Sequence, residues 1–139
     1  MAKILIVDDD LTLAEMYQER LAYDGHEVQI ASNGEEGLER AKIFQPDLIL
    51  MDIIMPRMNG LEAVNYLQTD LETRNIPLIL ISQMDQSYVG QQSPNILIAP
   101  TFISKQNHSP QTLADFVNQF LHRQKEADQT PKDPAGAKG

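Results

Sequence analysis

Polar and charged residues directly follow several short apolar runs of this chain. They are Asp8, Asp9 and Asp10 after the first run, Asp52 after the third, Ser82 after the fourth and Lys105 after the fifth. In a parallel sheet flanked by helices, the carboxyl ends of the strands share one edge, and ligands bind in the crevice outside it. If each apolar run is such a strand, these side chains converge at that edge.

This set of side chains suits phosphoryl transfer. Carboxylates that lie close together repel one another, and a hard divalent cation among them removes that cost. Mg²⁺ typically takes one or two carboxylates and keeps waters for phosphate oxygens. A lysine ammonium and a serine hydroxyl at the same edge would face the oxygens of a transferred group, whose charge the protein must neutralise.

Each of these residues also has an ordinary structural explanation. An aspartate triplet after a strand is commonly a solvated turn, and Asp10 is well placed to cap a following helix. Pro56 and Gly60, which follow Asp52, are normal turn residues. It is the joint placement of acids, serine and lysine at separate strand ends that favours a shared site.

The elements that must position these residues follow from the apolar pattern. Five short runs predict strands at residues 3–7, 27–31, 48–51, 78–81 and 101–103. The first, third and fourth are continuously apolar, which is typical of parallel strands covered on both faces. Apolar residues at helical spacing lie between them. They are Leu13, Met16, Tyr17 and Leu21, then Leu38 and Ala41, then Leu61, Val64 and Leu67, and finally Leu113, Phe116, Val117, Phe120 and Leu121. The alternation predicts a doubly wound α/β domain with right-handed crossovers.

Two segments depart from this alternation. Residues 82–100 should hold a fourth helix, but Gly90, Pro94 and Pro100 interrupt them, so we expect one short helical turn at 85–89 and irregular chain afterwards. Residues 125–139 carry no large apolar side chain. We therefore expect one domain at 1–124, followed by a disordered tail or linker at 125–139.

Composition excludes several classes of function. The chain has 139 residues, enough for one domain, and a net charge of −9, which argues against direct nucleic-acid binding because phosphate contacts need a basic face. It has no cysteine, so disulfides, thiolate chemistry and zinc sites of the cysteine type are excluded. No apolar run is long enough to cross a membrane, and the start lacks the pattern of a signal peptide. We expect a cytoplasmic protein.

Four motifs carry a resemblance to a known family. They are ILIVDDD at residues 4–10, LMDIIMPRMNG at 50–60, Ile81-Ser82, and Ile103-Ser104-Lys105. In this order and at this spacing they resemble the response-regulator receiver domain of two-component signalling, in the CheY-like superfamily. The resemblance covers about residues 2–124. It implies a flavodoxin-like fold, with a five-stranded parallel sheet in the order 2-1-3-4-5 flanked by helices, here with an atypical fourth helix.

The resemblance also implies a role for each site residue. Asp52 is the phosphoacceptor, and Lys105 and Ser82 contact the phosphoryl oxygens. The expected cofactor is Mg²⁺, with Mn²⁺ as a substitute. Its direct ligands are Asp9, Asp52 and the backbone carbonyl of Ile54, while Asp8 acts through water. Ser82 and Phe102 form the switch that changes position on phosphorylation.

The same resemblance implies the partners. The phosphoryl donor is a histidine kinase or a phosphotransfer protein, and the recipient of the signal is a downstream protein or a C-terminal output domain. Such a chain catalyses only its own phosphorylation and dephosphorylation and is not otherwise an enzyme. The sequence does not indicate an oligomeric state.

Three positions depart from the pattern of that family. Gln83 follows the switch serine where the family usually has a small residue, so Gln83 and the adjacent Met84 are expected to modulate access to the site and the lifetime of the phosphoryl group. Gln106 replaces the proline that usually follows the lysine, so the cis peptide expected there need not form. The segment 84–100 lacks a normal fourth-helix pattern, which predicts an unusual output surface.

Two alternatives stay open at this point. Asp8-Asp9-Asp10-Leu11-Thr12 also fits the opening motif of haloacid dehalogenase-like phosphohydrolases, in which Asp8 would be the nucleophile and Asp10 the general acid and base. That alternative leaves the motif around Asp52 without a purpose. The other is a receiver-like module that works through protein contacts with little or no phosphorylation.

Overall fold

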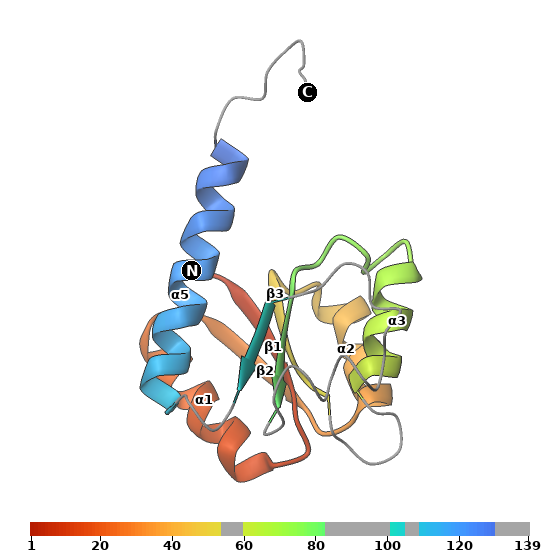
Figure 1. Cartoon of the computed structure of the whole chain (residues 1–139), viewed down its shortest axis with the longest axis horizontal. Helices are drawn as coiled ribbons and strands as arrows, with labels where there is room; N and C mark the ends of the chain where they lie inside the picture. The colour runs from red at the N-terminus through yellow and green to blue at the C-terminus, as the bar shows by residue number, and fades with distance from the viewer. Residues whose placement is uncertain (54–59, 83–100, 105–108, 130–139) are drawn as a thin grey trace.

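The computed structural model describes all residues except 54–59, 83–100, 105–108 and 130–139 (Figure 1). Strands and helices alternate along the described chain. They are β1 Lys3–Val7, α1 Leu11–Tyr23, β2 Glu27–Ala31, α2 Gly34–Phe44, β3 Leu48–Asp52, α3 Gly60–Thr69, β4 Leu78–Ser82, β5 Thr101–Ser104 and α5 Pro110–Gln129. Among the described helices, none combines the length and the hydropathy that spanning a membrane requires.

The strands form one parallel sheet in the order β2-β1-β3-β4-β5. Helices α1 and α5 pack together on one face of it, and α2 and α3 on the other (Figure 1). The α/β class with a parallel sheet between two helical layers is therefore confirmed. The expected irregular fourth helix falls within 83–100, outside the described residues.

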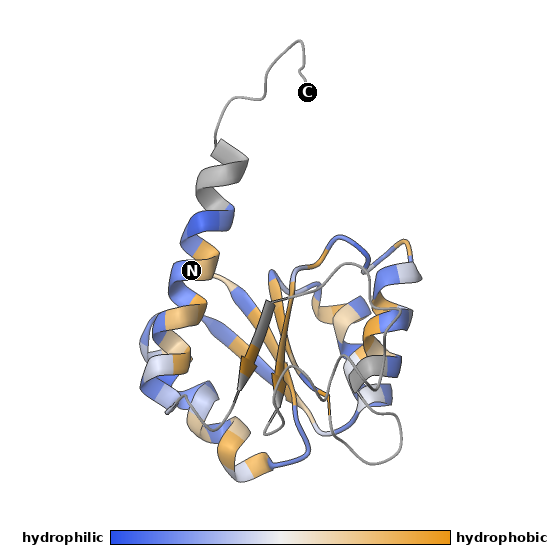
Figure 2. Ribbon diagram, viewed as in Figure 1, coloured by the Kyte–Doolittle hydropathy of each residue, from blue (hydrophilic) through white to orange (hydrophobic). Residues whose placement is uncertain are grey.

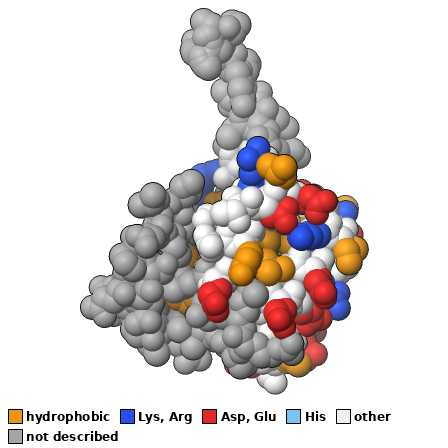
Figure 3. Space-filling model, turned by 90° about the vertical axis from the view of Figure 1, so that its right-hand side faces the viewer, with side chains coloured by type: hydrophobic (Ala, Val, Ile, Leu, Met, Phe, Trp, Pro, Cys, Tyr) orange, Lys and Arg blue, Asp and Glu red, His pale blue; other side chains and the backbone are white. Residues whose placement is uncertain are grey.

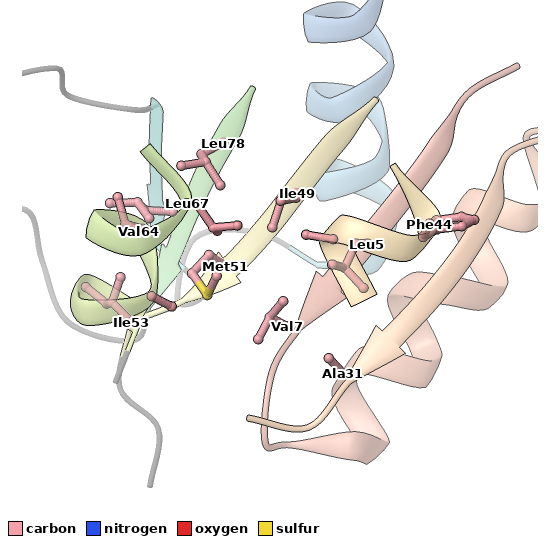
Figure 4. Close-up of a cluster of buried hydrophobic side chains, with 13 residues drawn as sticks. Leu5, Val7, Ala31, Phe44, Ile49, Met51, Ile53, Val64, Leu67 and Leu78 are labelled. Atoms are coloured by element: carbon pink, nitrogen blue, oxygen red, sulfur yellow. The ribbon is translucent and has the colours of Figure 1, made fainter. Parts of the chain in front are cut away.

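The continuous apolar runs are explained by the two-sided burial of the sheet (Figure 2). Ile4 and Ile6 of β1 pack toward α1 and α5, whereas Leu5 and Val7 pack toward α2 and α3, and all four are fully buried. Figure 4 shows the cluster of buried side chains that contains Leu5 and Val7, on the face of the sheet that α2 and α3 cover. Because successive side chains of a strand point to opposite faces, a strand covered on both faces has no position for a polar residue.

Helix α2 begins with a reciprocal cap and packs unusually close to β1. The Asn33 side chain accepts the N–H of Glu36 at 2.9 Å, and the Glu36 carboxylate accepts the N–H of Ser32 at 2.8 Å. A Cβ on Gly37 would lie 2.9 Å from Cγ2 of Val7, so only glycine lets α2 approach this closely. The cap and this contact hold α2 against the end of β1.

Two expectations need correction. Met16 lies 47% exposed, although its spacing suggested the core face of α1; the small Ala14 is buried there instead, together with Tyr17 and Leu21. Helix α5 ends at Gln129, so residues 125–129 are helical where a disordered tail was expected, while the domain boundary at residue 124 stays a prediction. Lys, Glu, Ala and Gln have high intrinsic helix propensity, which continues a helix even without apolar side chains. Disorder of 130–139 stays a prediction, because those residues are not described.

Candidate metal and phosphoacceptor site

Asp8 and Asp9 follow the last residue of β1. The backbone N–H of Asp8 donates to the carbonyl of Ala31 at 3.0 Å, which extends the pairing of β1 with β2. One carboxylate oxygen of Asp8 accepts the N–H of Asp10 at 2.9 Å, and Asp8 is fully buried. Asp9 is exposed. The end of β1 therefore holds one buried and one accessible carboxylate next to each other.

Asp10 has a different role. It is the N-cap of α1, and its side chain accepts the N–H of Leu13 at 3.2 Å. Its side chain is exposed, and it is not part of the group of metal-binding side chains found among the described residues. The sequence-based interpretation of Asp10 as a helix cap is confirmed.

Asp52 ends β3 and is 4% exposed. It pairs in register with Ile81 of β4, and the N–H of the next residue, Ile53, donates to the carbonyl of Ile81 at 3.2 Å. Four apolar residues of β3 precede Asp52, and all are fully buried. The sheet and its two helical layers thus hold this carboxylate firmly at the strand end.

The three carboxylates meet at one point of the sheet edge. Asp8, Asp9 and Asp52 each offer an oxygen, and these oxygens all lie within 4.8 Å of one another. Two buried unit charges at that separation repel by roughly 3–4 kcal/mol at an effective dielectric constant of about 20. A divalent cation between them would turn this repulsion into attraction, and an all-oxygen set of donors fits Mg²⁺.

The remaining expected site residues are only partly described. The backbone of Ser82 ends β4 beside Ser104, one position beyond the residue that pairs with Asp52, and the backbone of Phe102 pairs with Leu80. The side chains of Ser82 and Phe102 lie outside the described part of the structure. Ile54, Gln83, Met84 and Lys105 are not among the described residues at all, so their roles stay predictions.

Sequence reasoning missed two supports of this site. Gly37 lets α2 pack against Val7, immediately before Asp8, and no local signal in the sequence marks that contact. Glu36 anchors the loop after β2, whose last residue Ala31 holds the backbone of Asp8. The pKa of Glu36 is lowered, chiefly by the backbone N–H of Ser32. The sequence Ser32-Asn33-Gly34-Glu35-Glu36 is a cap signature that could have indicated this second support.

Comparison with known proteins identifies the family. The sequence pattern of the response regulator receiver domain matches residues 4–118. The chain belongs to this family. Receiver domains are signalling modules of two-component systems, and this chain is a phosphoacceptor receiver of that kind.

Individual relatives agree with the family. PilH of Pseudomonas aeruginosa is 47% identical over 88 residues, which are 62% of this chain and 71% of PilH. The alkaline phosphatase synthesis transcriptional regulatory protein PhoP of Bacillus subtilis is 33% identical over 86 residues, which cover 62% of this chain. The match spans only 35% of the length of PhoP.

Solved structures show the same fold. The chemotaxis protein CheY4 of Vibrio cholerae superposes with a TM-score of 0.76 at 28% identity, and the match covers 86% of this receiver and 98% of CheY4. The general fold expected from the resemblance is therefore confirmed. The phosphohydrolase and the phosphorylation-independent module are not favoured by these matches.

Proposed function

We propose that Asp52 is the residue of this receiver that accepts the phosphoryl group, with Mg²⁺ held directly by Asp9 and Asp52 and by Asp8 through water. One observation carries the proposal: the convergence of these three carboxylates within 4.8 Å at the carboxyl edge of the sheet. Asp52 ends the central strand of this edge, and an oxygen of its carboxylate is the nucleophile. Asp9, which is exposed, would be the carboxylate most accessible to an entering cation.

The chemistry is a simple displacement. An oxygen of the Asp52 carboxylate attacks the phosphorus, its new P–O bond forms an acyl phosphate, and the bond from phosphorus to the donor breaks. When the donor is a phosphohistidine, the imidazole nitrogen leaves with the electron pair of the P–N bond. Mg²⁺ held by Asp9 and Asp52 would supply positive charge that balances the oxygens of the transferred group. Within the proposal, Lys105 and Ser82 contact those oxygens, and the carbonyl of Ile54 completes the ligand set.

The sheet holds Asp52 in place during the transfer, and Asp8 is itself held beside it. Asp8 is fully buried and bonded to the N–H of Asp10, so its carboxylate has little freedom to turn away. The buried residues of β3 fix the backbone of Asp52 on the other side. Such positioning, together with electrostatic compensation, is most of what a protein contributes to phosphoryl transfer.

The proposal extends to the partners and the output. A histidine kinase or phosphotransfer protein supplies the phosphoryl group, and a downstream protein or a C-terminal output domain responds. The added negative charge would draw Ser82 toward Asp52 and let Phe102 turn inward, which changes the surface around β4 and β5. Gln83 and Met84 would set how readily water and donors reach the acyl phosphate.

The test is phosphorylation by acetyl phosphate in the presence of Mg²⁺, followed by intact-protein mass spectrometry. We expect one phosphoryl group on the wild-type chain, removed by hydroxylamine as an acyl phosphate, and none on Asp52→Ala. Asp115→Ala, which removes an exposed acid on α5, is the control and should be labelled normally. Labelling that persists in Asp52→Ala but is lost in Asp8→Ala would instead support the phosphohydrolase.

A further inference from the structure

The outer edge of the sheet at β2 has open backbone groups. The N–H of Glu27 donates to the carbonyl of Ala2 at 2.9 Å, and the carbonyl of Ala31 accepts the N–H of Asp8 at 3.0 Å, so these residues face β1. Backbone groups of successive residues in a strand point in opposite directions within the sheet. Val28 and Ile30 therefore direct their N–H and C=O groups away from β1, and β2 is the last strand on that side.

Only part of this edge is covered. The Gln18 side chain of α1 donates to the carbonyl of Val28 at 3.0 Å. In the described part of the chain, no other segment bonds to the outward N–H of Val28 or to the N–H and C=O of Ile30. Exposed edges of this kind can pair with a strand from another protein.

A groove adjoins the edge on the side of α2. Its volume is about 540 Å³, and its lining includes Glu27 and Gln29 of β2 as well as Glu39, Ile43 and Phe44 of α2. Ile43 is 84% exposed, whereas Phe44, the last residue of α2, is buried. Figure 3, which views the side that carries α2 and α3, shows acidic, basic and hydrophobic side chains close together on this face. The groove therefore combines apolar contact area with acidic groups.

Some charged side chains of the groove have polar partners, and others form no ion pair. The Lys3 ammonium donates to the carbonyl of Phe44 at 3.3 Å and lies 5.4 Å from the centre of its ring. Arg40 bonds both Glu36 and Gln29 at 3.1 Å. Glu27 and Glu39 are exposed and form no ion pair with any described residue. The lining thus carries the carboxylates of Glu27, Glu36 and Glu39 against the cations of Lys3 and Arg40, so its net charge is negative next to an open strand edge.

We propose that the β2 edge and this groove bind an extended, basic segment of a partner protein, which adds to the sheet beside β2. Main-chain hydrogen bonds to Val28 and Ile30 would supply affinity, and every second side chain of the segment would enter the groove. Lysine or arginine at those positions meets Glu27 and Glu39. A second copy of this chain is a poorer occupant, because it carries a net charge of −9 and presents the same acids.

The inference is independent of phosphorylation at Asp52. Asp52 ends β3, and β1 lies between β3 and β2. Binding at the β2 edge should therefore persist in Asp52→Ala. The phosphoacceptor proposal and this proposal can accordingly fail separately.

The test uses the full chain and a capped synthetic peptide of alternating valine and lysine, with a valine–glutamate peptide as the control. NMR amide shifts and hydrogen exchange report the site. We expect the lysine peptide to slow exchange of the Val28 and Ile30 amides. Glu27→Lys with Glu39→Lys should weaken its binding about tenfold. Glu15→Lys with Glu19→Lys changes the net charge equally on the exposed face of α1 and should leave binding within about twofold.

Three results would overturn the proposal. Equal weakening by both double variants would show attraction by net charge alone. Changes in the NMR chemical shifts without slower hydrogen exchange of the Val28 and Ile30 amides would show that the peptide does not pair with β2. Slower exchange that depends on protein concentration in the absence of peptide would show that the edge pairs with a second copy.

Discussion

Asp9 and Asp10 are neighbours in the chain, yet their carboxylates have different surroundings. Asp9 shares the site with Asp8 and Asp52, whereas Asp10 caps α1. We expect Asp9→Ala to raise the Mg²⁺ concentration needed for half-maximal phosphorylation by tenfold or more, since it removes a direct ligand from the three converging carboxylates. Asp10→Ala should lower the free energy of unfolding by about 1 kcal/mol through loss of the cap.

Urea unfolding and Mg²⁺ titration of phosphorylation, run on both variants, separate these roles. Asp10→Ala is the matched control, because it removes the adjacent carboxylate and the same charge. If Asp10→Ala changed the Mg²⁺ requirement as much as Asp9→Ala, the assignment of the ligand set would be wrong.

Gly37 determines how closely α2 approaches the strand that carries Asp8. An alanine Cβ there would lie 2.9 Å from Cγ2 of Val7, so the helix or the valine must shift. We expect Gly37→Ala to lower the free energy of unfolding by about 1–2 kcal/mol, although alanine is the better helix former by about 1 kcal/mol. In a Val7→Ala background, Gly37→Ala should lower the free energy of unfolding by less, because the clashing methyl groups of the valine are gone. Urea denaturation of the four proteins measures this coupling, and identical costs in both backgrounds would contradict it.

At the residue scale, the sequence predicted the three carboxylates of the site but not Gly37 and Glu36, which hold the surrounding backbone in place. The ends of strands follow from the apolar runs, so the pattern of residues alone places Asp8, Asp9 and Asp52 together. Whether Asp10 belongs to the site depends on the φ and ψ angles of the loop, which the sequence pattern leaves open between a ligand and a cap. Gly37 acts through a tertiary contact with β1, and no local pattern records such a contact.

At the scale of the elements, Asn118 joins α5 to the end of α1. Its Oδ1 lies 2.6 Å from Nε2 of His26, and its Nδ2 donates to Asp24 at 2.8 Å. This amide is the largest cause of the lowered pKa of Asp24. We expect Asn118→Ala to raise the pKa of Asp24 toward its ordinary value and to lower the free energy of unfolding by about 1–2 kcal/mol.

An NMR titration of the Asp24 carboxyl and urea denaturation measure the two effects of Asn118→Ala. Gln119→Ala, at the exposed neighbouring position of α5, is the control and should change neither quantity. An unchanged Asp24 pKa in Asn118→Ala would refute the proposed link between the helices.

The elements also show where periodicity is a good guide and where it is not. In β1, β3 and β4 the continuous apolar runs specify burial on both faces, and each strand is found as expected. In α1 the buried face is centred on Ala14, Tyr17 and Leu21, because a small residue lets the helix lie close to its neighbours, and the larger Met16 lies at the margin. Residues 125–129 were expected in a disordered tail but belong to α5, because its last turns depend on helix propensity and not on an apolar stripe.

At the scale of the whole molecule, the free energy of unfolding should fall at low pH in a predictable way, which we call the acid limb of its pH dependence. The pKa values of Asp24, Glu36 and Asp70 all lie below their ordinary values. For Glu36 the largest cause is the N–H of Ser32, and for Asp70 it is the N–H of Glu72. Groups whose pKa is lower in the folded state contribute stability that is complete above their unfolded pKa values of 3.8 and 4.5. That stability is lost as the pH falls through the lowered values.

We therefore expect these three groups to leave the free energy of unfolding unchanged down to about pH 4.5 and to reduce it progressively at lower pH. Glu36→Gln isolates one of them, because the amide oxygen can still accept the bonds from Ser32 but does not titrate. Urea denaturation in steps from about pH 6 to about pH 3 should give a shallower acid limb for Glu36→Gln than for the wild type. Glu15→Gln, which removes an exposed glutamate on α1, serves as the matched control and should retain the wild-type slope. If the free energy of unfolding fell with pH at the same slope in all three proteins, protonation of Glu36 would not contribute to acid unfolding. The bonds from Ser32 to Glu36 would then have the same strength in both protonation states.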